Sequence, residues 1–247
     1  MQHARKNIQW LDKDRLVITA IKAIQYTEIA LDIGSGIMPQ NYVTPVIHIC
    51  VEPFDQYVRY LHKKICTSFD RQYIIIKASW EEVLDLFPEK SVDTIFLIDV
   101  IEHIEKKVAI RLLKESEKIV RKQIVIFTPL GFVSQHHSDG KDAWGLDGGK
   151  WQEHKSGWEP QDFDNSWNIY VTKKFHFTDN LGKKLKKPFG AFFAIKNMSF
   201  SKKKSDNYFR NKKNIIFQIY RQTILLNNVY LLRFLLRFLT LVNKIKN

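Results

Sequence analysis

Short, continuous apolar runs alternate with segments of helical apolar spacing along the first half of the chain. The apolar runs predict strands near residues 29–33, 46–51, 73–76, 92–98 and 123–127, and helical spacing predicts helices over 11–24, 54–65, 80–86 and 102–120. Strands that are apolar throughout are buried on both faces, which is typical of a parallel sheet covered by helices. The pattern therefore predicts an α/β domain with a doubly wound, mostly parallel sheet.

The alternation ends near residue 128. Residues 130–160 are rich in Gly, His, Trp and Asp and have no clear period, which favours an insert that acts as a lid or binding loop. Residues 168–171 and 189–195 predict an antiparallel hairpin at the sheet edge, which brings the sheet to seven strands. Beyond this domain of residues 1–200, we expect a basic linker over 201–214 and an amphipathic helical tail over 215–247, with Arg233 and Arg237 on its polar stripe.

The charge of the chain is unevenly distributed. Residues 1–172 hold 21 Lys or Arg and 24 Asp or Glu, whereas residues 173–247 hold 18 and 2, so the net charge of +13 arises from the carboxyl third. Such asymmetry indicates contact with a polyanion, whether nucleic acid, anionic lipid or a phosphorylated substrate. No charged amino-terminal stretch leads into a long apolar run, and Cys50 and Cys66 do not form a disulfide framework. We therefore expect a cytoplasmic protein.

A glycine turn and a carboxylate form the most informative motif. The first predicted strand ends at Asp32 and is followed by Gly34, Ser35 and Gly36, and the next strand ends at Glu52, 18 positions after Gly34. Glycines at the carboxyl end of a strand allow a sharp turn and a close approach of backbone to a ligand. A carboxylate about twenty residues further on can accept hydrogen bonds from ribose hydroxyls. The motif predicts a site for a molecule that contains an adenosine-like ribose.

Several motifs resemble class I S-adenosylmethionine-dependent methyltransferases. Residues 31–36 resemble the first motif of that family, residues 51–53 the second, and residues 124–129 its fifth strand. Residues 92–104, with the sequence Asp-Val-Ile-Glu-His at 99–103, closely resemble the fourth-strand motif, and the two late strands match the final hairpin. The resemblance covers about residues 26–200. It implies a Rossmann-like fold and S-adenosylmethionine as the cofactor.

The resemblance also implies roles for individual residues. Asp32, Gly34, Ser35 and Gly36 would form the floor beneath the methionine portion of the cofactor. Glu52 would bind the ribose, and Ser79 and Trp80 would flank the adenine. The residues after the fourth strand would line the methionine side near the methyl group. The implied cofactor-binding set is Asp32, Gly34, Ser35, Gly36, Glu52, Ser79, Trp80, Asp99 and Val100. Only about ten residues separate Gly36 from the next strand, so the family's usual first helix is expected to be truncated or missing.

Base candidates for methyl transfer lie in the insert. We favour His154, in the aromatic segment 151–158, because imidazole titrates near neutral pH and a related segment stands at the mouth of the site in some family members. The alternative is that His154 only bonds backbone in a folded lid. Asp99 is a second catalytic candidate. Glu102 and His103 are expected to be structural, at the start of the long helix. No metal is expected, because His136, His137 and the nearby aspartates lack a firm ligand spacing.

The acceptor is left open by these motifs. The favoured hypothesis is a methyltransferase acting on oxygen or nitrogen of a small-molecule, glycan or lipid-linked acceptor, with the tail lying on the inner, anionic face of a membrane. Arg221, Arg233 and Arg237 argue against a spanning helix, and the same apolar face could instead pack on the core or on a second subunit. The alternatives are an RNA methyltransferase that uses the basic carboxyl-terminal region, and a non-catalytic membrane- or partner-binding relative.

Overall fold

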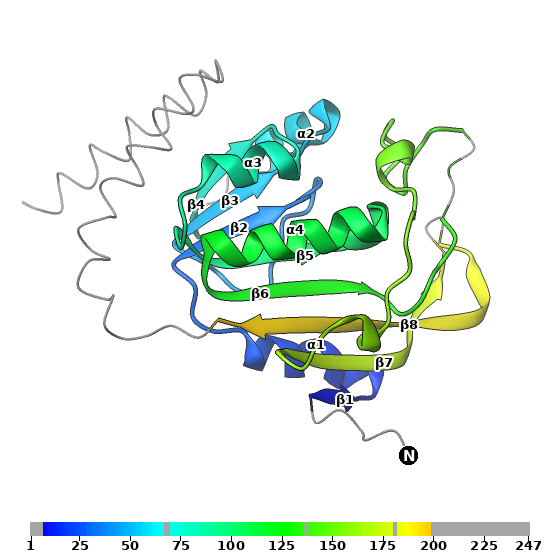
Figure 1. Ribbon diagram of the computed structural model, residues 1–247. Helices are drawn as coiled ribbons and strands as arrows, with labels where there is room; N and C mark the ends of the chain where they lie inside the picture. The colour runs from blue at the N-terminus through cyan, green and yellow to red at the C-terminus, as the bar shows by residue number, and fades with distance from the viewer. Residues whose placement is uncertain (1–6, 67–69, 136, 138, 180–181, 199–247) are drawn as a thin grey trace, which may run out of the picture.

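The computed structural model describes residues 7–66, 70–135, 137, 139–179 and 182–198 (Figure 1). Its α-helices are α1 (Lys13–Ala23), α2 (Asp55–Ile65), α3 (Trp80–Leu86) and α4 (Lys106–Ile119). Three 3-10 turns are η1 (Ile101–His103), η2 (Gly149–Trp151) and η3 (Pro160–Asp162). The strands are β1 (Ile8–Trp10), β2 (Ile29–Ile33), β3 (Ile47–Val51), β4 (Gln72–Ile76), β5 (Val92–Ile98), β6 (Val120–Pro129), β7 (Trp167–Thr178) and β8 (Lys184–Asn197).

The strands form one sheet in the order β1-β7-β8-β6-β5-β2-β3-β4. Strands β2 to β6 are parallel, and β8 pairs antiparallel with both β6 and β7, so the predicted doubly wound sheet with an antiparallel last hairpin is confirmed. The predicted count of seven strands was wrong, because β1 adds an eighth strand parallel to β7. This strand has only three residues and an exposed Trp10, so it leaves no apolar run in the sequence.

The two faces of the sheet are covered by different helices. Ala30 and Phe96 pack against Leu16 of α1, and Cys50 on the same face packs against α2. The opposite face, which includes Leu31, packs against α3 and α4 in the largest core cluster. Figure 1 shows α1 and α4 on opposite sides of the strands. Both faces of each central strand are therefore buried, as the continuous apolar runs predicted.

The long helix begins later than its periodicity predicts. α4 starts at Lys106, and residues 101–103 instead form the 3-10 turn η1. The Ile101 carbonyl accepts hydrogen bonds from Ser156 Oγ at 3.0 Å and Trp158 Nε1 at 3.2 Å. The same carbonyl also accepts from the Ile104 amide at 3.4 Å, so the insert docks onto the 3-10 turn itself.

The insert over residues 130–160 crosses the carboxyl end of the sheet between β6 and β7. Its two ends meet where Leu130 and Gly131 form isolated bridges with Trp158. The expected basic linker (201–214) and helical tail (215–247) lie outside the described residues. Within the described residues, no helix is both long enough and apolar enough to cross a membrane.

Candidate functional site

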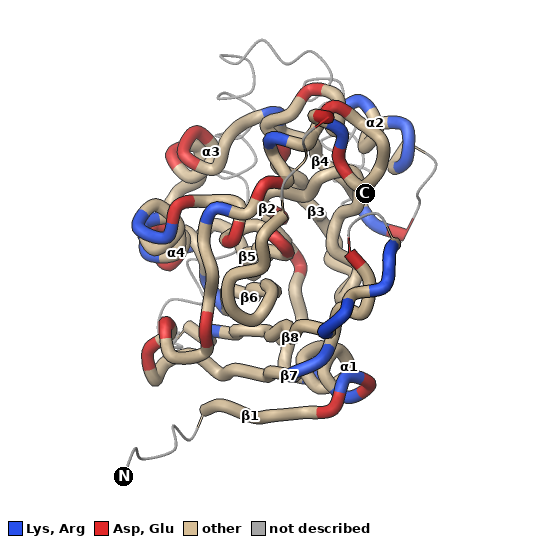
Figure 2. The backbone as a smooth tube through the Cα atoms, turned by 90° about the vertical axis from the view of Figure 1, so that its right-hand side faces the viewer, with Lys and Arg blue, Asp and Glu red and all other residues tan. Residues whose placement is uncertain are grey.

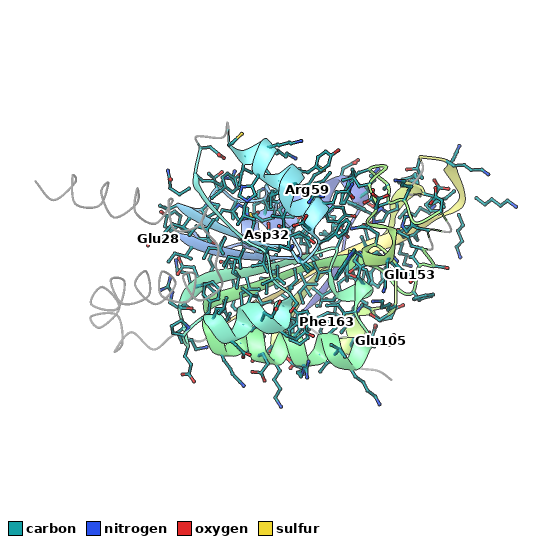
Figure 3. All side chains as sticks on the ribbon, turned by 90° about the horizontal axis from the view of Figure 1, so that it is seen from above. Glu28, Asp32, Arg59, Glu105, Glu153 and Phe163 are labelled. Carbon is teal, nitrogen blue, oxygen red and sulfur yellow. The ribbon has the colours of Figure 1, made fainter. Side chains whose placement is uncertain are left out.

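A cavity of about 550 Å³ lies at the carboxyl ends of β2, β5 and β6. The insert and the end of the β7–β8 hairpin form its remaining walls, at the right-hand end of the sheet in Figure 1. This is the position at which open α/β sheets bind ligands, since strand order reverses between β2 and β5. In the view from above, Asp32 lies at the centre of the molecule and Glu153 lies on the insert (Figure 3).

The loop after β2 forms one wall and has the conformation that its glycines predicted. Gly34 and Gly36 have φ angles of 69° and 54°, which L side chains rarely adopt. A Cβ at Gly34 would lie 2.8 Å from Val100 Cγ2, so the position also requires the absence of a side chain. Gly34, Ser35 and Gly36 all line the cavity, whereas Val100 packs behind Gly34. The sharp turn and the close backbone approach are both present.

Glu52, at the tip of β3, is positioned to hold this loop. Its Oε2 accepts a hydrogen bond from the Gly36 amide at 2.9 Å, and its Oε1 accepts one from the Phe54 amide at 2.8 Å. The side chain is only 4% exposed, and burial raises the pKa of Glu52 to about 7 despite both hydrogen bonds. Glu52 lies directly behind the cavity wall, so its contact with a ribose stays a prediction.

Asp32 faces the cavity from β2 and is paired within the sheet. Its Oδ2 accepts hydrogen bonds from the Gln40 amide at 2.8 Å and pairs with His48 Nε2 at 3.0 Å. His48 is fully buried and stacks on Tyr73 of β4. No helix forms over residues 34–46, as the short spacing predicted. Instead the Gln40 side chain closes the loop through bonds to the backbone of its neighbours.

The structure does not bring Ser79 and Trp80 to the cavity. Ser79 caps α3, and its Oγ accepts a hydrogen bond from the Glu82 amide at 3.3 Å. Trp80 faces α4, where the Arg111 guanidinium lies 5.1 Å from its ring, and it lines a separate cavity between α3 and α4. Their expected contact with an adenine stays a prediction that this placement does not favour.

Two carboxyl groups meet at the end of β5. Asp99 lines the cavity with a left-handed φ of 52°, a strained conformation for a residue other than glycine. Glu102 also lines it but is only 2% exposed, and its Oε2 accepts a hydrogen bond from Thr128 Oγ1 at 3.0 Å. Burial raises the pKa of both carboxyls, and the charge of Asp99 raises the pKa of Glu102 further. The pair therefore retains a proton above the pH at which an isolated carboxyl would lose it.

His103 and His154 lie side by side in the cavity wall, and their ring centroids are 4.9 Å apart in an edge-to-face arrangement. His103 Nδ1 lies 3.2 Å from the Glu153 carbonyl, and His154 Nδ1 lies 2.6 Å from the Val133 carbonyl. A carbonyl only accepts, so Nδ1 carries the hydrogen in both rings and Nε2 keeps the lone pair in the neutral form. Burial lowers the pKa of both histidines, to about 4 for His103.

His154 bonds backbone through Nδ1, as one alternative predicted, and it also lines the cavity, so its catalytic role stays a prediction. His103 and Glu102 were expected to be structural, at the start of the long helix, and the structure instead places both in η1, where they line the cavity. Their place directly after the β5 strand, two and three positions beyond Val100, is the signal that could have identified them. Neither lies in the α4 helix to which the sequence assigned them.

The segment around Ser156 fixes His154 beside η1. The Lys155 and Ser156 amides donate to the Glu102 carbonyl at 2.7 and 3.0 Å, and Ser156 Oγ donates to the Ile104 carbonyl at 2.7 Å. A Cβ at Gly157 would lie 2.6 Å from the Phe132 amide nitrogen, so only glycine fits there. The Ser-Gly-Trp sequence after Lys155 therefore serves to dock the insert against η1.

Trp144 is a cavity residue that the sequence did not single out. Its ring lies 3.5 Å from the position of a Cβ at Gly36, and it meets Tyr57 of α2 edge to face. Tyr57 donates to Asp142 Oδ2 at 2.5 Å, which ties the insert to α2. The insert thus covers the glycine loop as well as η1.

No family model matches this sequence, and no curated protein matches it either. Solved structures do resemble it. A SAM-dependent methyltransferase from Methanosarcina mazei superposes with a TM-score of 0.51 at 12% identity, over 73% of this chain and 96% of its own. The YcgJ protein of Bacillus subtilis gives a TM-score of 0.50 at 11% identity, over 75% of this chain and 98% of its own.

TehB from Haemophilus influenzae gives a TM-score of 0.50 at 13% identity, and the match spans 75% of this chain and 62% of TehB. At these identities the likeness shows the fold. The chain has the Rossmann-like fold of class I S-adenosylmethionine-dependent methyltransferases.

Proposed function

We propose that the protein is an S-adenosylmethionine-dependent methyltransferase that methylates an oxygen or nitrogen atom. The observation that carries the proposal is the loop of Gly34 and Gly36 at the point where strand order reverses, held by the Glu52 carboxylate at the tip of the adjacent strand. A bare backbone turn beside a carboxylate suits a nucleoside with an extended chain.

The charge of the cavity supports this cofactor over a dinucleotide. Asp32, Asp99 and Glu102 line the cavity, and no lysine or arginine is among its lining residues in the described part of the chain. A sulfonium and an ammonium group are stabilised by such carboxylates, whereas a pyrophosphate would be repelled by them. The floor formed by Asp32 and the glycine loop would hold the methionine portion, with Asp99 beside the methyl group.

The reaction needs alignment more than chemical assistance. The acceptor's lone pair attacks the methyl carbon in line, the carbon–sulfur bond breaks, and its electron pair stays on sulfur to give S-adenosylhomocysteine. The acceptor loses one proton in this step. His154 can accept that proton, because burial lowers its pKa and so favours the neutral ring, in which Nε2 keeps a lone pair. The surrounding walls exclude water and orient the two reactants.

The acceptor is proposed to carry negative charge. The β7–β8 hairpin contributes His176 and Leu185 to the cavity wall. Its lysines form a run of blue at the end of the sheet where the loops gather (Figure 2). They are Lys173, Lys174, Lys183, Lys184, Lys186 and Lys187. None of these lysines lines the cavity, so they suit a phosphate that stays outside it, on a small-molecule, glycan or lipid-linked acceptor. Peripheral binding of residues 215–247 to an anionic membrane would bring a lipid-linked acceptor to the site.

RNA is the second candidate acceptor, favoured by the same lysines. Binding driven by many phosphate contacts weakens steeply as salt increases, whereas transfer to a small acceptor does not. A transfer assay with methyl-labelled cofactor against separated lipid, nucleic-acid and small-molecule fractions, at low and moderate salt, distinguishes the two acceptors.

Cofactor binding is tested by calorimetry with S-adenosylmethionine and S-adenosylhomocysteine. We expect one cofactor per chain, and loss of binding in Gly34→Val, whose side chain would collide with Val100 and fill the loop. Gly140→Ala is the matched control, since Gly140 has a similar φ of 73° and no heavy atom within 4 Å of its Cβ position. A folded wild-type protein that binds neither compound would contradict the proposal.

A further inference from the structure

We propose that Glu102, His103 and His154 bind a divalent transition-metal ion on the acceptor side of the cavity. One carboxylate oxygen and one ring nitrogen from each histidine lie within 4.8 Å of one another. Donor atoms around a tetrahedral ion at 2.0–2.1 Å lie about 3.3 Å apart, so small side-chain rotations bring these three onto one ion. The sequence analysis predicted no metal ion at this place.

The hydrogen bonds of the two histidines leave the ligating nitrogens free. Each Nδ1 donates to a backbone carbonyl, Glu153 for His103 and Val133 for His154. In the neutral rings, each Nε2 then has a lone pair, and neither Nε2 has a hydrogen-bond partner among the residues that the structure describes. A backbone carbonyl on Nδ1 is the arrangement that orients histidine ligands in metal sites.

Glu102 supplies the second, independent observation. It is only 2% exposed and lines the cavity, and no N–H or O–H group of the described residues other than a protonated carboxyl donates to its buried Oε1. The Glu102 and Asp99 carboxyls interact with one another, so without a cation they must share a proton. Its other oxygen is held by Thr128 Oγ1, which fixes the carboxylate as metal-bound carboxylates usually are. A cation bound to Glu102 can take the place of that shared proton and compensate the buried charge of the ionised carboxyls.

The backbone around these residues is built to hold them. The Glu102 carbonyl accepts from the Lys155 and Ser156 amides, so the chain next to His154 is tied to the residue next to His103. Two imidazoles and one carboxylate suit Zn²⁺, Mn²⁺, Fe²⁺ or Co²⁺ more than Mg²⁺ or Ca²⁺, which prefer oxygen ligands. The cavity leaves room for water or an acceptor at the remaining positions of the ion.

The metal site also favours one chemical class of acceptor, an inference that rests on the proposed function. A hydroxyl oxygen bound to the ion would lose its proton to water more easily and would be held for in-line attack on the methyl carbon. His154 would then act as a ligand in place of a base. The geometry therefore favours a hydroxyl acceptor over an amine.

Metal binding is tested directly on the full chain, purified without a histidine tag and stripped with a chelator. Equilibrium dialysis against Zn²⁺ or Mn²⁺ should show one bound ion per chain, and the variants of the cluster should lose it. The Co²⁺-loaded protein should show visible absorption bands typical of nitrogen and oxygen ligands. Because even outer contacts of metal sites change affinity 10- to 100-fold, His154→Ala and Glu102→Gln should weaken binding by about 100-fold or more. An excess of Mg²⁺ should not compete.

Matched controls are His62→Ala and Glu105→Gln, which remove an exposed histidine and an exposed carboxylate outside the cavity. Both should bind metal like the wild type. Circular dichroism checks folding, and if the buried Glu102→Gln variant does not fold, the half-buried His154→Ala variant decides. The proposal is overturned if the wild type binds no ion, or if His154→Ala binds as tightly as the wild type.

Calorimetry with S-adenosylhomocysteine on the metal-free protein separates this inference from the proposed function. Cofactor binding without metal binding would overturn the metal site alone. Metal binding that depends on His154 without cofactor binding would overturn the methyltransferase and leave the metal site standing.

Discussion

Two clusters of similar composition include residues that line the cavity, and they differ in how their hydrogen bonds are directed. Asp32, His48 and Cys50 form one, and Glu102, His103 and His154 form the other, each with donor atoms within 4.8 Å. In the first, His48 Nε2 is consumed by Asp32, which also accepts the Gln40 amide. In the second, both Nδ1 atoms lie at backbone carbonyls, so the Nε2 atom of each ring keeps its lone pair in the neutral form.

The origin of the residues explains the difference. Asp32 and His48 lie on the same face of neighbouring strands, where Ala30 pairs with His48 and Asp32 with Cys50, so sheet register brings them together inside the core. Glu102, His103 and His154 come from a 3-10 turn and a loop beyond the strand ends. Side chains paired within a sheet stabilise the fold, whereas side chains on loops beyond the strand ends keep polar atoms available to bind a ligand.

The largest expected effect tests this assignment of roles. His48→Ala should destabilise the protein by about 3–5 kcal/mol, because it leaves the buried Asp32 carboxyl without its partner and opens a hole beside Tyr73. His154→Ala should cost only about 1 kcal/mol, because it removes one hydrogen bond from a half-buried side chain. Urea unfolding of both variants, without metal and cofactor, measures the two values. Equal destabilisation would show that the two clusters do not differ in role.

The sequence predicted the sheet and the glycine loop because both depend on local signals. Continuous apolar runs define β2 to β6, and the turn at Gly34 and Gly36 needs no distant residue. The role of His103 depends on the insert, since its Nδ1 partner Glu153 is 50 positions away. No spacing within the β5 motif reveals that contact.

The position of the Trp80 side chain also depends on a contact that is distant in the sequence. Its orientation is set by Arg111 of α4, which packs on it from a distant part of the sequence. The resemblance to a family transferred a position after the third strand, and the packing of α3 on α4 decided where the side chain points. Positions that depend on a single strand end were thus predictable from the sequence, and side-chain orientations set by a second element were not.

Glu52 shares one feature with each cluster. Like Asp32, it accepts hydrogen bonds from backbone amides, and like the second cluster, it is expected to contact a ligand. Ribose hydroxyls donate to the ionised carboxylate, so binding should favour the deprotonated form. With a pKa of Glu52 at about 7, affinity for S-adenosylhomocysteine should rise with pH and fall about tenfold from pH 8 to pH 6. Calorimetry across this range measures the change.

Glu52→Gln is the control for that titration. The amide keeps the size of the side chain but does not titrate, so the variant should bind more weakly at pH 8 and lose the pH dependence. A wild-type affinity that stays constant between pH 6 and pH 8, or a variant that keeps the slope, would show that Glu52 only holds the loop through Gly36 and Phe54.

The smallest expected effect concerns Trp80. Because its ring packs under Arg111 and lines the cavity between α3 and α4, Trp80→Leu should leave cofactor affinity within about twofold, or roughly 0.4 kcal/mol. Loss of the cation–π contact should lower stability by about 0.5–1 kcal/mol. Calorimetry with S-adenosylhomocysteine and urea unfolding of the same variant test both values. A tenfold loss of affinity would instead mean that the ring turns toward the adenine when the cofactor binds, as the family resemblance implied.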